Sequence, residues 1–196
     1  MHTEDKKTVD PNAFVEAFEK KVKENLTKFL QGIEALDSHV PECPDVEEKW
    51  GIIARAYLPD GTREFKDYPI TSLGWMMLMG MAMSYYWDTD WTKYADKDDY
   101  YVKLRDEAGY DKFDETVLHN LLGYEGEAEE KISQLVSDCA ARVYSLLSHE
   151  QIEPGTDIAF GCYIAALHQL YLAGMAMELN ALGYHMTPFT GTPSLN

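Results

Sequence analysis

The chain has 196 residues, of which 45% are hydrophobic, and its 34 acidic and 17 basic side chains give a formal net charge of −17. This length accommodates one well-filled hydrophobic core, and the composition is that of a folded protein. The negative charge disfavours binding to nucleic-acid phosphates and to anionic lipid head groups.

The cysteines and the N-terminus indicate the compartment. Cys43, Cys139 and Cys162 form an odd set without a CxxC spacing, which argues against a disulfide framework or a zinc knuckle and fits a reducing environment. Residues 1–10 lack the apolar segment of a signal peptide. We therefore expect a flexible N-terminus over these residues and a cytoplasmic protein.

The first element in chain order is a long helix. Asp10 and Pro11 are typical of a helix start, because Asp caps free N–H groups and Pro fits the first turn. Apolar residues then recur every three or four positions, which predicts an amphipathic helix over residues 11–37. Pro41 and Pro44 predict an extended connector after it.

The next segment, residues 51–68, changes its pattern. Two short runs rich in β-branched and aromatic residues flank Pro59, Asp60 and Gly61, a triplet that is typical of a turn. The pattern predicts a two-stranded β-hairpin. Because an isolated hairpin is barely stable in water, we expect it to pack against the helices.

An uncharged stretch of eighteen residues follows, from Ile70 to Trp87. It predicts a helix over residues 71–87 with Thr71 or Ser72 as its cap. As a helix it has no polar face, so it must be a core helix or a membrane span. A span is disfavoured because acidic residues stand at its flanks, where Lys or Arg would anchor it.

The segment from residue 88 to residue 130 is strongly acidic, since its 14 acidic and 5 basic residues supply −9 of the −17 charge. Its aromatic residues predict one short helix that ends at Ala108 and turns its rings inward. A second short helix is predicted over residues 112–122, with Asp111 as its cap. One side of the molecule should therefore be strongly negative.

Two further long helices are predicted in the last third of the chain. Residues 127–149 carry one apolar stripe, and residues 157–182 are apolar on every side, with Asp157 as cap and Glu178 as the single further charge. The composition of residues 184–196 predicts an extended C-terminal tail.

Together these elements predict a mainly α, single-domain bundle over residues 11–183, in which two amphipathic helices shield the two apolar ones and the hairpin is attached. Both apolar helices contain the sequence GMAM, at residues 80–83 and 174–177. The repeat is a trace of two related halves or a coincidence. Since Gly and Ala permit close approach beside adaptable Met side chains, we expect the two apolar helices to pack on each other.

No catalytic motif stands out, so candidate sites rest on single residues. Glu178 and His168 are the carboxylate and the imidazole that stand out within the last apolar helix, and each is either a satisfied core group or part of a site. A pocket between the two apolar helices would be lined by five residues: Trp75, Tyr86, His168, Tyr171 and Glu178.

Metal binding has one weak candidate pair, Glu115 and His119, which lie one helical turn apart. The pair lacks a second half elsewhere in the chain, so we expect no cofactor. The cluster of methionines near residue 80 suits Cu(I) chemically, but core packing explains it better.

Two functions follow from these features. The first is an acidic, non-catalytic binding or interaction protein, with abundant Met and aromatic surface to bury, that acts as a homodimer or other homo-oligomer and contacts a protein with a basic surface. The alternative is a small-molecule-binding protein or enzyme, metal-assisted or not, with its pocket between the apolar helices.

Overall fold

A computed structural model describes residues 10–150 and 152–185. In these ranges the chain is mainly helical and contains no strand, which confirms the predicted mainly α fold. Residues 1–9 of the predicted flexible N-terminus (1–10) and residues 186–196 of the predicted tail (184–196) lie outside the described residues, whereas Asp10 caps the first helix. The helices are α1 (Pro11–Gly32), α2 (Pro44–Glu47), α3 (Trp50–Phe65), α4 (Pro69–Tyr94), α5 (Tyr100–Ala108), the 3-10 turn η1 (Tyr110–Lys112), α6 (Phe113–Glu115), the π-helix η2 (Thr116–Leu121), α7 (Glu127–His149) and α8 (Asp157–Ala181).

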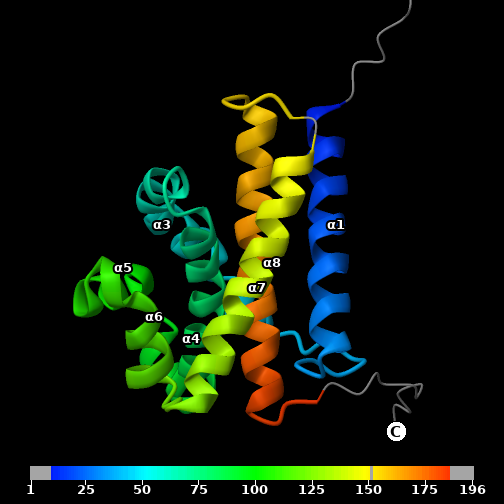
Figure 1. Ribbon diagram of the computed structural model, residues 1–196. Coiled ribbons are helices and arrows are strands. Elements are labelled where there is room, and N and C mark those ends of the chain that lie inside the picture. The colour runs from blue at the N-terminus through cyan, green and yellow to red at the C-terminus, as the bar shows by residue number, and fades with distance from the viewer. Residues whose placement is uncertain (1–9, 151, 186–196) are drawn as a thin grey trace, which may run out of the picture.

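The four long helices, α1, α4, α7 and α8, form the bundle (Figure 1). The apolar helices α4 and α8 make the most extensive contact of any two elements, as predicted. Helix α1 covers α8, and α7 covers α4. Helix α3 and the acidic segment from α5 to η2 lie on the side of the bundle opposite α1 (Figure 1).

Three of the long helices run in the same direction. Glu19 of α1 lies against His168 of α8, and Ala35 after α1 lies against Asn180 near the end of α8, so these helices are parallel. Helix α4 is also parallel to α8, and α7 runs opposite to them (Figure 1). The ends of α1, α4 and α8 therefore meet at one end of the molecule, here called the lower end.

Helix α1 begins as predicted and ends earlier. The Asp10 carboxylate accepts a hydrogen bond from the Asn12 N–H at 3.1 Å, and Pro11 occupies the first turn. The helix ends at Gly32 rather than at residue 37, because Glu34 takes a left-handed conformation with φ 61°. The N–H groups of Ala35 and Leu36 then bond the Leu30 carbonyl and close the helix end.

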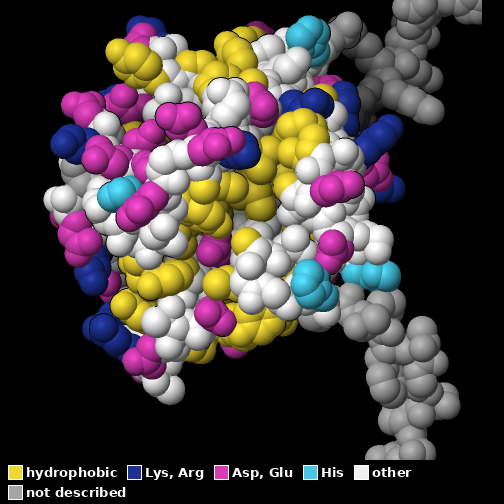
Figure 2. Space-filling model, turned by 60° about the horizontal axis from the view of Figure 1, so that its bottom comes forward, with side chains coloured by type: hydrophobic (Ala, Val, Ile, Leu, Met, Phe, Trp, Pro, Cys, Tyr) yellow, Lys and Arg dark blue, Asp and Glu magenta, His cyan; other side chains and the backbone are white. Residues whose placement is uncertain are grey.

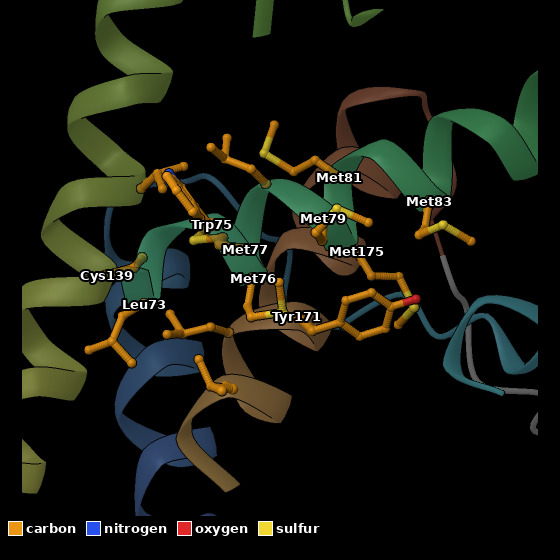
Figure 3. Packing of buried hydrophobic residues seen from close by; sticks show 14 of the residues in the cluster. Leu73, Trp75, Met76, Met77, Met79, Met81, Met83, Cys139, Tyr171 and Met175 are labelled. Carbon is orange, nitrogen blue, oxygen red and sulfur yellow. The ribbon is translucent and has the colours of Figure 1, made fainter. Parts of the chain in front are cut away.

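Residues 72–84 of α4 are buried on every side, which is why this stretch of the sequence has no polar face. Its five methionines are each 0% exposed, and Figure 3 shows them leaving the helix on several sides, with Tyr171 and Met175 of α8 alongside. The helix starts at Pro69 and has no side-chain cap, so the predicted cap at Thr71 or Ser72 is wrong. It kinks at Asp90, whose carboxylate accepts from the Lys93 N–H.

The contact between α4 and α8 depends on the glycine of each GMAM sequence. A Cβ atom on Gly80 would lie 2.0 Å from the Tyr171 carbonyl oxygen, and one on Gly174 would lie 1.9 Å from the Met77 carbonyl oxygen. Met77 and Tyr171 each precede their own glycine by three positions, so the two contacts are reciprocal. The repeated sequence thus marks the point where two parallel backbones touch.

The predicted β-hairpin over residues 51–68 is wrong, because this segment is the helix α3 with Pro59 inside it. The buried residues of α3 recur with helical spacing: Ile53, Ala54, Tyr57, Asp60 and Gly61. The turn signal of the Pro-Asp-Gly triplet is a local preference, and burial of this face against α4 and α5 outweighs it. Pro59 itself is exposed, where its ring meets solvent.

The acidic segment is also divided differently from the prediction. The last turn of α4 runs on to Tyr94, and α5 ends at Ala108 as expected. The second predicted helix, residues 112–122, is made of a 3-10 turn, one short α-turn and a π-helix, and Asp111 does not cap it. At α8, Thr156 rather than Asp157 is the cap, since its hydroxyl accepts from the Ala159 N–H at 3.2 Å.

In the described part of the chain, α8 is the one helix that is long and apolar enough to span a membrane. Its most apolar window is 56% buried inside the bundle. This is weak evidence for a span, because the core helix of a water-soluble protein has the same composition.

Candidate functional site

The five residues predicted to line one pocket do not share a cavity. Direct backbone contact at Gly80 and Gly174 fills the space between α4 and α8 at that level. Trp75 packs on Phe113 and Tyr57 at the outer side of α4, and Tyr86 stacks on Tyr94 with ring centroids 4.2 Å apart. These two aromatic residues therefore face the acidic segment and α3 rather than α8.

His168 lies on the face of α8 that contacts α1. Its Nδ1 is 2.9 Å from a carboxylate oxygen of Glu19, and its ring stacks on Trp50 at 4.9 Å. The same oxygen of Glu19 accepts a hydrogen bond from the Gln169 amide at 2.8 Å. With about a third of its side chain exposed, His168 is a bonded group at the edge of the bundle.

Tyr171 is a fully buried structural residue. Its hydroxyl donates to the Val46 carbonyl at 2.7 Å and so holds α2 against α8. Burial raises the pKa of Tyr171 well above its usual value, which keeps the phenol neutral and bonded.

Glu178 is a buried carboxyl with a raised pKa. It is 4% exposed in the last turn of α8 and accepts one hydrogen bond, from the Tyr124 hydroxyl at 3.3 Å. Burial raises the pKa of Glu178 to about 7, the Tyr124 bond lowers it, and the nearby charge of Asp88 raises it. The side chain can exchange a proton near neutral pH, although it lines neither of the two inter-helix cavities described below.

A stability measurement can test this assignment. The folded protein holds the Glu178 proton up to about pH 7, while an unfolded glutamate loses it near 4.5. Rising pH therefore removes up to about 3 kcal/mol of stability in this range, and none above it. In urea unfolding, the free energy of unfolding of Glu178→Gln relative to that of the wild type should rise by this amount as the pH increases from about 4 to about 8.

The exposed residue Glu130 provides the control, because Glu130→Gln removes the same charge from the surface of α7. The free energy of unfolding of this variant should stay close to that of the wild type at every pH. A Glu178→Gln difference that is independent of pH would contradict the raised pKa.

The candidate metal pair does not assemble into a site. Glu115 and His119 are both exposed, and no group of three His, Cys, Asp or Glu residues with metal-binding geometry occurs among residues 10–150 and 152–185. His119 instead lies 3.2 Å from the Glu129 carboxylate and 3.2 Å from the Tyr124 carbonyl.

The cysteines are packing residues. All three are buried, and burial raises the pKa of each thiol, in the case of Cys139 to about 12. Since the thiolate is the nucleophile, none of these side chains is activated for covalent chemistry at neutral pH.

Sequence reasoning missed a buried ionic cluster around Asp60, because that residue was assigned to a turn. Asp60 is 6% exposed and accepts from the Tyr101 hydroxyl and from the Arg105 guanidinium, each at 3.0 Å. Arg63, one turn further along α3, lies 3.5 Å from the other carboxylate oxygen. The cluster joins α3 to α5. Asp60 and Arg63 lie three positions apart, and this spacing was the one local sequence pattern that could have indicated an ion pair on a helix.

Two cavities lie between long helices. One of about 130 Å³ lies between α1 and α8, and one of about 170 Å³ lies between α4, α7 and η2. Trp75 lines the second of these, with Thr71, Ser133, Ser137 and Asp114 at its polar side.

The upper end of the bundle carries a partly exposed aromatic surface. We define the upper aromatic surface as Phe65, Tyr144, Phe160 and Tyr163, from α3, α7 and α8. Phe160 is 47% and Tyr144 38% exposed. Phe65 contacts Tyr144 and Tyr163, with ring centroids 6.0 Å and 4.8 Å apart. An open groove runs along Phe65, Phe160 and Tyr163.

The lower end is apolar and acidic. We define the lower acidic surface as the exposed apolar residues Ile33, Leu182 and Tyr184 with the exposed carboxylates Glu34, Asp37 and Asp88. Figure 2 shows hydrophobic side chains running across this end with Asp and Glu around them. The Tyr184 hydroxyl donates to Asp88 at 2.6 Å, which ties the end of α8 to α4.

Comparison with known proteins provides no relative, because no family model, curated protein or solved structure matches the chain.

Proposed function

We propose that the protein is a non-catalytic interaction protein that acts in the cytoplasm as a homodimer and binds a protein with a basic surface. The observation that carries this proposal is the upper aromatic surface. Buried aromatic anchors dominate the binding energy of protein interfaces, and here Phe160 and Tyr144 remain exposed beside a groove.

The upper aromatic surface suits contact between two copies of the chain. Arg63 and Lys66 lie close to Phe65 in the sequence, as do Glu64 and Asp67, so charges of both signs surround the rings. Two chains with a net charge of −17 repel each other, and a contact region of mixed sign keeps this repulsion lowest.

The lower acidic surface suits a basic partner. Its apolar residues, Ile33, Leu182 and Tyr184, offer area to bury, and the surrounding carboxylates select Lys and Arg on the partner. The alternative function, a pocket between the apolar helices, is less favoured because the backbones of α4 and α8 touch at Gly80 and Gly174.

Native mass spectrometry of the protein isolated from its own cells at low salt tests both contacts. The wild type should be a dimer that retains a basic protein. Phe160→Ser should give a monomer that still retains the partner, with dimerisation at least tenfold weaker, because removing an aromatic anchor costs more than about 1.4 kcal/mol.

Ile33→Ser is the matched variant, since Ile33 is 48% exposed and Phe160 47%. It should leave the dimer intact and weaken partner retention. A wild type that is monomeric at every concentration would contradict the homodimer, and equal effects of both variants would contradict the assignment of two separate surfaces.

A further inference from the structure

The cavity of about 130 Å³ between α1 and α8 has no role in the proposed interactions. It lies under the connector that follows α1, and its inner wall is apolar. Leu26 and Leu30 come from α1, Leu36 from the connector and Met175 from α8, and all four are at most 4% exposed. For comparison, an apolar protein cavity of about 150 Å³ holds benzene.

The mouth of this cavity is charged. Lys23 and Thr27, one turn apart on α1, lie on one side, and Glu42 and Glu47 lie on the connector and on α2. Among residues 10–150 and 152–185, the side chains of Lys23, Glu42 and Glu47 make no hydrogen bond or ion pair. Charges of both signs thus lie at one opening, and no ion pair joins them among the described residues.

The side-chain amide of Gln169 is a further polar group in the lining of this cavity. Gln169 lines the cavity and is 6% exposed. Its amide N–H donates to Glu19 at 2.8 Å, while its carbonyl oxygen has no hydrogen-bond donor among the described residues. The carbonyl oxygen of this amide can accept a hydrogen bond from an N–H group of a ligand in the cavity.

We infer that this cavity binds a free apolar α-amino acid of about the size of leucine. The ligand ammonium would face Glu42, Glu47 and the Gln169 carbonyl oxygen. The ligand carboxylate would face Lys23 and the Thr27 hydroxyl, and the apolar side chain would fill the space between Leu26, Leu30 and Met175. A zwitterion matches the two signs of charge at the mouth, whereas a simple amine or acid leaves one sign unmatched.

Isothermal titration calorimetry of the full chain with L-leucine tests this inference. Glycine lacks the side chain, 4-methylpentanoate lacks the ammonium, and 3-methylbutylamine lacks the carboxylate. Leucine should bind about tenfold to a hundredfold more tightly than glycine, the amount that burial of its side chain provides. It should bind at least about tenfold more tightly than the amine or the acid, because each loses a charge-assisted hydrogen bond.

Two variants and one control link the binding to the cavity. Ala173→Leu places a larger side chain in the cavity wall and should abolish leucine binding. Lys23→Gln should weaken it about tenfold, while Lys20→Gln, an exposed α1 lysine outside the cavity, should leave it unchanged. The inference is overturned if leucine gives no binding heat, if 3-methylbutylamine binds as tightly as leucine, or if Ala173→Leu, folded by circular dichroism, binds leucine normally.

Discussion

Gly174→Ala is expected to destabilise the protein by about 3 kcal/mol or more. The added Cβ would lie 1.9 Å from the Met77 carbonyl oxygen and 2.8 Å from the Met77 carbonyl carbon. These atoms are backbone in the middle of α4, so no side-chain rotation can relieve the clash, and the two central helices must separate. Separation would open voids around the buried methionines, which adds to the cost.

Urea unfolding followed by circular dichroism at 222 nm measures this effect. Gly51→Ala is the matched control, because Gly51 also lies in a helix and an added Cβ there meets nothing within 4 Å. That variant should be neutral or gain about 0.5–1 kcal/mol, since alanine is the better helix former. Equal stability of the two variants would show that α4 and α8 do not meet through their glycines.

Asp60→Ala is expected to cost about 3–5 kcal/mol, because it removes one partner from a buried ion pair. The Arg105 guanidinium, with its side chain 25% exposed, would lose its bond of 3.0 Å to Asp60. The Tyr101 hydroxyl would lose its acceptor in the core. The loss should loosen α5 from α3, since this cluster joins the two helices.

The control is a second carboxylate on the same arginine. Asp106 lies 2.8 Å from Arg105, but its side chain is 62% exposed. Asp106→Ala should therefore cost less than about 1 kcal/mol. If both variants lose the same free energy of unfolding, the cluster around Asp60 is an ordinary surface ion pair.

The sequence allowed prediction of the long helices because their signals are periodic over many turns. The apolar stripes of α1 and α7 and the uncharged runs of α4 and α8 each extend over at least 22 residues in the structure. Such patterns match only one regular structure, and the Gly and Ala content of α4 and α8 correctly indicated that they touch.

The segment from Pro59 to Gly61 was misread because its local preference and its tertiary contacts disagree. The turn residues favour a hairpin in isolation. In the protein, Tyr57 donates to the Ser72 carbonyl and Asp60 bonds Arg105, contacts with residues 15 and 45 positions away in the chain. No local pattern contains such partners, so the helix could not be predicted from its own residues.

The candidate site was only partly predictable for the same reason. Glu178 stood out as a single charge on an apolar helix, and the structure places it in the core with a raised pKa. His168 stood out in the same way but lies at the edge, beside Glu19 and Trp50. Burial of a titratable group depends on which helices cover it, and this information is not local.

The parallel course of α1, α4 and α8 has an electrostatic consequence. Each helix carries about half a negative charge at its C-terminus, and three such ends meet at the lower end of the molecule, where α7 begins and where Asp45 in the first turn of α2 bonds Trp87. The last turn of α4 contains Lys93, whereas no basic residue lies in the last turn of α1 or α8 to offset their dipoles. Peptide dipoles therefore add to the carboxylates of the lower acidic surface, favour a cationic partner there, and act on Glu178 in the direction that keeps its proton bound.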